Sequence, residues 1–148
     1  MILLDTDHLT VLRYEDDPRC ARLTSRLRSS MDPQVATTVI TAEEQLRGWL
    51  AEINRWRDVR KQVPAYGRLA RLFEFFSQWE LVPFSDAAAD EFDRLRKQRI
   101  RSGTQDLKIA SIALVQQALL LSANLRDFLR VPELRVENWL EEPRVEGQ

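Results

Sequence analysis

Short apolar stretches recur along the chain, and each is followed by residues that favour a turn or the start of a helix. The first stretch, Ile2–Leu4, is apolar without interruption, which predicts a strand buried on both faces, as in a parallel sheet. Stretches rich in aliphatic and β-branched residues predict four further strands, at 35–40, 81–84, 119–122 and 134–136. We expect the first strand to lie near the middle of the sheet.

The segments between these strands have the apolar spacing of helices. After the second strand, a helix is expected to begin at Thr41, because Thr41 and Glu44 have the spacing of a capping box. This helix is predicted to end before Pro64 and to pair with a second one at 66–79 as a long helical hairpin. Strands that alternate with helices predict a three-layer α/β/α fold with a mostly parallel central sheet.

The length of 148 residues favours one domain, at 1–140, followed by a polar tail at 141–148. Cys20 is the only cysteine and His8 the only histidine, so an internal disulfide and zinc sites built on several cysteines or histidines are excluded. We expect Cys20 to be a small, partly buried side chain. The start of the chain lacks the pattern of a secretory signal and no apolar run is long enough to span a bilayer, which predicts a cytoplasmic protein without a membrane partner.

Four acids stand just after a predicted strand or at the start of a helix: Asp5, Glu44, Asp106 and Asp127. In an open parallel sheet the segments that follow the strands meet at one edge, where ligands bind. Carboxylates gathered there repel one another unless a cation neutralises them, and oxygen ligands suit Mg²⁺ or Mn²⁺. Such a site can activate water for phosphodiester hydrolysis. Many acids in the first turn of a helix are only caps, so the pattern alone leaves both interpretations open.

These acids lie in stretches that resemble a known family, the PIN-domain ribonucleases and specifically the VapC-type toxins of bacterial toxin–antitoxin pairs. The similar stretches occur in the family's order and extend over most of the chain: 2–9 (ILLDTDHL), 39–48 (VITAEEQLRG), 103–114 (GTQDLKIASIAL) and 122–128 (SANLRDF). There are departures at positions where the family usually has apolar residues, but none removes an acid: Gln45, Ser102 and Gln105.

The resemblance implies a PIN-like fold and a Mg²⁺-dependent endoribonuclease, in which Mn²⁺ can substitute. By their positions in the motifs, Asp5, Glu44 and Asp106 match the acidic core of the family, and Glu44 rather than Glu43 does so by its distance from Gly48. Asp5 and Asp106 would hold the metal directly.

For the fourth acid we favour Asp127, although some members carry an acid where Asn124 stands. Glu44 and Asp127 would be further ligands or would reach the metal through water. Ser122 and Asn124 are expected to contact water or phosphate. The resemblance also implies an RNA substrate, a cognate antitoxin protein and a homodimer.

Several residues near these motifs have a structural and a functional interpretation. We expect His8 to be a structural or surface residue rather than a general base, and Asp7 to be a helix cap rather than a water-mediated metal ligand. Arg99 and Arg101 belong to a basic cluster that is either a solvated helix face or a phosphate contact. Ser102 and Thr104 are expected to cap the following helix, and packing is favoured over RNA stacking for Trp49, Trp56 and Trp79.

Two other functions compete with the nuclease. Asp5-Thr6-Asp7 has the Asp-x-Asp pattern of a haloacid-dehalogenase-type phosphatase, with Asp5 as nucleophile and Asp7 as general acid. Against it, Leu9 stands where such enzymes have a hydroxyl residue or Val, and Glu44 has no role. The other candidate is a non-catalytic module that keeps the fold and binds a partner.

Overall fold

The computed structural model describes residues 1–32 and 34–142, so residue 33 and residues 143–148 of the expected tail lie outside the described residues. At its centre is a five-stranded sheet in the order β3-β2-β1-β4-β5. All neighbouring strands are parallel, and β1 lies in the middle, as expected. The strands are β1 (Ile2–Leu4), β2 (Val35–Thr38), β3 (Leu81–Val82), β4 (Leu119–Leu121) and β5 (Arg135–Glu137).

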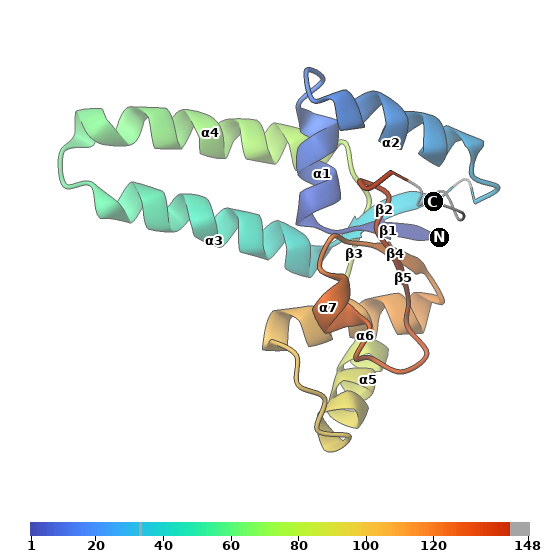
Figure 1. Cartoon of the computed structure of the whole chain (residues 1–148). Helices are drawn as coiled ribbons and strands as arrows, with labels where there is room; N and C mark the ends of the chain where they lie inside the picture. Colours follow the sequence, from blue (N-terminus) through green and yellow to red (C-terminus); the bar gives the residue numbers. More distant parts are fainter. Residues whose placement is uncertain (33, 143–148) are drawn as a thin grey trace.

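Helices connect the strands and form the outer layers (Figure 1). In Figure 1, α1 and α2 lie on one side of the sheet, α5, α6 and α7 lie on the other, and α3 and α4 extend away from it as a long hairpin. The three-layer α/β/α fold is thereby confirmed. The helices are α1 (Thr6–Arg13), α2 (Pro18–Ser29), α3 (Val39–Arg55), α4 (Val59–Ser77), α5 (Asp86–Lys97), α6 (Thr104–Gln116) and α7 (Leu125–Phe128).

The central strand β1 supplies side chains to both apolar cores. Leu3 packs in the core beneath α5 and α6, whereas Ile2 and Leu4 pack in the core with residues of α1 and α2. Each of these three side chains is at most 2% exposed. Burial of one such side chain contributes about 1.5–3 kcal/mol, so the apolar run before Asp5 fixes that acid at the centre of the sheet. Cys20 is partly buried against the second core, as expected.

The boundary between β2 and α3 differs from the prediction. Val39 and Ile40 belong to α3, and the helix is capped by Thr38 rather than by Thr41. The Thr38 hydroxyl accepts the Thr41 amide at 3.0 Å, and it also bonds the Thr41 hydroxyl. The β-branched residues made the strand look longer, but a buried threonine cap overrides that preference.

The turn of the helical hairpin also lies elsewhere. The hairpin itself is present, but α3 ends at Arg55, and Asp58 caps α4 by accepting the Arg60 amide at 3.0 Å. Pro64, the predicted stop, lies inside α4. It lies in the second turn, where it removes one backbone donor, and the packing of the two long helices maintains α4 around it.

The start of α6 provides a further correction. Its N-cap is Gly103, without a side-chain cap, so the predicted caps at Ser102 and Thr104 are wrong. The Ser102 hydroxyl instead donates to the Asp127 carbonyl at 3.1 Å and ties the loop before α6 to α7. Among the described residues, no helix is long and apolar enough to cross a membrane.

The cap at Thr38 can be tested with Thr38→Val, which keeps the shape but leaves the buried Thr41 amide without its acceptor. We expect the free energy of unfolding, measured by urea denaturation, to fall by about 1–3 kcal/mol. Thr10→Val is the control, because Thr10 is exposed and its hydroxyl donates only to the Thr6 carbonyl one turn back. A loss as large in the control would contradict the assignment of the cap.

Candidate active site

The structure brings the predicted acids to one edge of the sheet. Asp5 directly follows β1, Asp106 lies in the first turn of α6, and Asp127 lies in α7. Glu44 comes from α3, in its second turn rather than its first, because the helix begins at Val39. The charge of Asp5 acts on Glu44, that of Asp106 acts on Asp5 and Glu44, and that of Asp127 acts on Asp106. The acids therefore form one electrostatic group.

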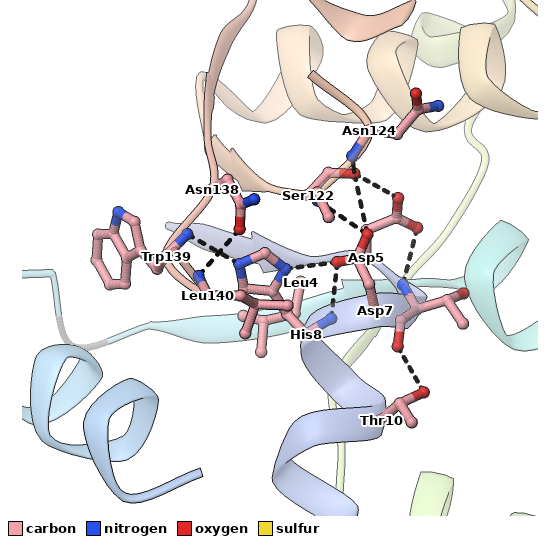
Figure 2. Close-up of polar contacts among 12 residues, drawn as sticks. Leu4, Asp5, Asp7, His8, Thr10, Ser122, Asn124, Asn138, Trp139 and Leu140 are labelled. Atoms are coloured by element: carbon pink, nitrogen blue, oxygen red, sulfur yellow. Dashed lines mark hydrogen bonds and ion pairs between the residues drawn. The ribbon is translucent and has the colours of Figure 1, made fainter. Parts of the chain in front are cut away.

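Asp5 is both a helix cap and a member of this group. It is only 9% exposed, and one carboxylate oxygen accepts the Thr6 amide at 2.8 Å as the N-cap of α1. The other oxygen accepts the Ser122 hydroxyl at 2.8 Å (Figure 2). Burial raises the pKa of Asp5 and the charges of Asp7 and Asp106 add to that effect, while the bonds from Thr6 and Ser122 oppose it. The capping role of Asp5 is therefore compatible with its place in the acidic group.

Asn124 connects Asp106 and Asp127, two of the acids in the group. Its side-chain amide donates to Asp106 at 3.2 Å and to Asp127 at 3.1 Å. Burial raises the pKa of Asp106, the charge of Asp127 raises it further, and the bond from Asn124 opposes the shift. Arg130 lies 3.6 Å from the Asp127 carboxylate across one turn. Asn124 thus holds the two carboxylates close together without neutralising either.

Of the two neighbouring glutamates in α3, Glu44 belongs to the group. Burial raises its pKa, and the charges of Asp5 and Asp106 add to the effect. Glu43 is bound elsewhere, accepting the Gln105 side-chain amide at 2.7 Å and lying 3.3 Å from Arg47. This difference supports the choice of Glu44 over Glu43.

Asp7 was expected to cap α1, but the cap of this helix is Asp5. Its carboxylate accepts a hydrogen bond from the His8 ring Nδ1 (Figure 2). It also accepts one from the Ala123 amide at 2.8 Å. Burial alone would raise the pKa of Asp7, but these bonds outweigh it and lower the pKa. Asp7 therefore links the start of α1 to the loop after β4.

His8 is fully buried, which confirms its structural interpretation. Its Nε2 accepts the Trp139 backbone amide at 3.1 Å, so in this arrangement Nδ1 carries the proton that is donated to Asp7. The ring thereby joins the segment after β5 to Asp7 (Figure 2).

Two arginines predicted to contact substrate, and two contacts not predicted from sequence, complete the description of the site. Arg99 and Arg101 are exposed in the loop between α5 and α6, and their contact with substrate stays a prediction. The pairing of Arg130 with Asp127 has a local signal, their spacing of one helical turn. The contact between Asp7 and Ala123 joins distant parts of the chain and has no such signal.

The donors available at this edge suit a hard divalent cation. They are carboxylate and amide oxygens, and the Thr6 hydroxyl next to Asp5 is buried with no hydrogen-bond partner in the described part of the chain. Within residues 1–32 and 34–142, no three acidic, histidine or cysteine side chains are arranged as a ready-made metal cage. Mg²⁺ usually binds through one or two carboxylates and keeps several waters, so the open donor set fits this ion.

Comparison with known proteins gives two kinds of similarity, although no family model matches the chain. It is 34% identical over 74 residues to Ribonuclease VapC2 of Rickettsia felis, covering 47% of this chain and 55% of that protein. It is 35% identical over 92 residues to Ribonuclease VapC of Rickettsia bellii, covering 59% of this chain and 66% of that protein. The matched stretches thus span less than two thirds of both curated relatives.

The similarity to solved structures extends over nearly the whole chain. VapBC2 from Rickettsia felis, bound to a promoter DNA fragment, superposes with a TM-score of 0.68 at 24% identity, covering 94% of this chain and 99% of that one. DNA-bound VapBC from Salmonella typhimurium gives a TM-score of 0.69 at 22% identity, covering 93% and 97%. The chain has the fold of these VapBC structures, which confirms the fold class that the motifs predicted. The similarity to the two curated ribonucleases supports the VapC-type family that the motifs resemble.

Repulsion among the grouped acids should cost stability when no cation is present. The folded protein binds a proton at Asp106 more tightly than the unfolded chain does, because its folded pKa is raised above 3.8. The resulting cost is absent well below pH 3.8, appears as the pH rises through that value, and is complete above the raised folded pKa.

Asp106→Asn should therefore stabilise the metal-free protein at neutral pH. We expect its Tm to rise by about 2 °C, as roughly 0.5–1 kcal/mol would produce in a domain of this size, and the gain to vanish in acid. Thermal unfolding in the presence of a chelator measures it. Asp86→Asn, in the exposed first turn of α5, is the control and should not raise the Tm. A gain that persists at low pH would contradict repulsion as its cause.

Proposed function

We propose that this protein is a metal-dependent endoribonuclease, the toxin of a toxin–antitoxin pair. The observation that carries the proposal is the group of Asp5, Glu44 and Asp106, each with a pKa raised by burial and by neighbouring acids. Two relatives of partial coverage are named Ribonuclease VapC, which supports the same activity. A histidine or serine nucleophile is not required for this chemistry.

Each acid has a proposed role. Asp5 and Asp106 would hold Mg²⁺, or Mn²⁺ in its place, and Glu44 and Asp127 would complete the cluster and orient the attacking water. The ion would supply an activated water and stabilise the leaving oxygen of the phosphodiester. Ser122 holds the Asp5 carboxylate, and the Asn124 amide holds those of Asp106 and Asp127.

The phosphatase alternative requires Asp7 to act as a general acid. A general acid needs a pKa near the working pH, yet the pKa of Asp7 is lowered, and its oxygens accept bonds from His8 and Ala123. These contacts favour a structural Asp7 and disfavour the phosphatase.

The proposed partners follow from the solved relatives. The Rickettsia felis and Salmonella structures are VapBC complexes, which supports a cognate antitoxin for this chain. We also propose a homodimer that acts in the cytoplasm on cellular RNA.

The activity can be tested by following RNA cleavage with Mg²⁺, with a chelator, and with Asp5→Asn. We expect chelation to abolish cleavage and Asp5→Asn to lower its rate about 10²-fold or more, since a ligand charge is lost. Asp86→Asn is again the control, because it removes an exposed acid of the first turn of α5 that has no proposed role. This variant should cleave RNA like the parent. Cleavage that survives both the chelator and Asp5→Asn would overturn the proposal. A protein that binds a peptide partner but neither Mn²⁺ nor RNA would be a non-catalytic module.

A second prediction concerns how His8 supports the site. His8→Asn can still donate to Asp7, whereas His8→Gln can still accept the Trp139 amide but loses the bond to Asp7. Because Asp7 holds the loop that carries Ser122, His8→Gln should lower the cleavage rate about tenfold, while His8→Asn should retain most of it. Equal rate losses at equal thermal stability would show that His8 does not act through Asp7.

A further inference from the structure

A pocket of arginines and aromatic rings lies between the end of α1 and the helical hairpin. Its volume is about 420 Å³, and its lining comes from α1 and the residue after it, from α3 and from α4: Arg13, Tyr14, Trp49, Arg68 and Arg71. Figure 1 shows α1 beside the base of the hairpin. The Arg13 guanidinium lies 5.1 Å from the centre of the Phe75 ring, which places α1 against α4 there.

The pocket carries positive charge that the protein does not balance locally. In the described part of the chain, the salt bridges involve neither Arg13 nor Arg68 nor Arg71, and no acid lines the pocket. Arg19 and Arg94, by contrast, each pair with a carboxylate within 2.8 Å. Like charges held together without a counter-charge attract an anionic ligand.

The aromatic rings indicate which anion suits the pocket. Arg68 lies over Trp49 at 5.3 Å and Arg13 over Tyr14 at 6.0 Å, so the guanidinium groups are held by rings rather than by acids. Tyr14 is 58% exposed and can accept a stacked base. Guanidinium forks bind phosphate, and rings together with guanidinium planes stack unpaired bases of RNA. An acidic peptide would use the charges but not the rings.

The position of the pocket suits RNA that extends from the acids. Asp5 caps the start of α1 and Arg13 ends that helix, about 12 Å further along its axis. On α3, Trp49 lies about 7.5 Å beyond Glu44 along the axis. Both helices therefore lead from the acidic group towards the pocket.

We infer that this pocket binds a phosphate and an unpaired base of single-stranded RNA, beside the bond that the acids cleave. The inference rests on the proposed nuclease function and adds a substrate subsite to it. Packing was the favoured interpretation of Trp49 from sequence, whereas its place in a pocket with unpaired arginines favours substrate contact.

The test is binding of a fluorescent single-stranded RNA to Asp5→Asn protein, which holds the RNA without rapid cleavage, measured by anisotropy over a range of salt concentrations. Adding Arg68→Gln with Arg71→Gln should weaken binding about tenfold or more and reduce the salt slope by about 2, one for each lost phosphate contact. Adding Trp49→Leu should weaken binding about fivefold or more without changing the slope. Arg60→Gln, exposed on α4 outside the pocket, is the matched control and should change the slope less.

Cleavage by protein with an intact Asp5 separates this inference from the proposed function. The pocket variants should raise KM and leave kcat near that of the parent. If the parent cleaves RNA while the variants keep its KM and RNA affinity, the subsite is wrong and the nuclease stands. If RNA binding depends on the pocket but the parent never cleaves, the nuclease is wrong and the subsite stands. Binding of polyglutamate that depends on the pocket, with RNA binding that does not, would assign the pocket to an acidic protein and overturn the inference.

Discussion

The hydrogen bond from the Ser122 hydroxyl to the Asp5 carboxylate joins the ends of the two central strands. It exists because β1 and β4 pair in parallel with Leu4 opposite Leu121, and because the Asp5 amide donates to the Leu121 carbonyl at 2.9 Å. This register places the residues after each strand side by side. A slip of one residue would turn buried leucines toward the opposite face and separate Asp5 from Ser122, so the site depends on the packing of the sheet.

The groups that hold the acids are mostly neutral. Ser122 donates to Asp5, and Asn124 donates to both Asp106 and Asp127. A lysine or arginine in their place would lower the pKa of these carboxyls and cancel the charge that a cation needs. Arg47 is an exception: it pairs with Glu43 at 3.3 Å, and its charge opposes the rise in the pKa of Glu44 without cancelling it. The protein thus bears the cost of repelling carboxylates, which is the expected cost of a binding site rather than of a structural one.

The parts of the fold that follow from local rules were predictable from sequence. The apolar run before Asp5 predicted a buried central strand, and the first turn of α6 predicted the place of Asp106. The boundaries of helices and strands were predicted wrongly where one residue favours one structure and its neighbour favours another. Val39 and Ile40 suit a strand, but the hydroxyl of Thr38 starts a helix there, and Pro64 is accommodated inside α4. The bonds that Asp7 makes to Ala123 and His8 makes to Trp139 required the folded chain, because their partners lie more than 100 positions away.

The distribution of charge shows why composition hid the candidate function. The formal net charge of −1 suggests no preference for nucleic acid, yet the grouped acids and the arginines of the pocket lie in different parts of the fold. Acids gather at the ends of β1 and β4, while Arg13, Arg68 and Arg71 gather between α1 and the hairpin. The basic cluster visible in the sequence is partly neutralised, since Arg94 pairs with Glu91. The basic pocket instead forms where α1 meets the hairpin of α3 and α4, which follows α1 in the chain only after α2 and β2. A metal-dependent nuclease would benefit from this arrangement, because arginines beside the carboxylates would compete with the cation, whereas arginines between α1 and the hairpin would be free to bind the rest of an RNA strand.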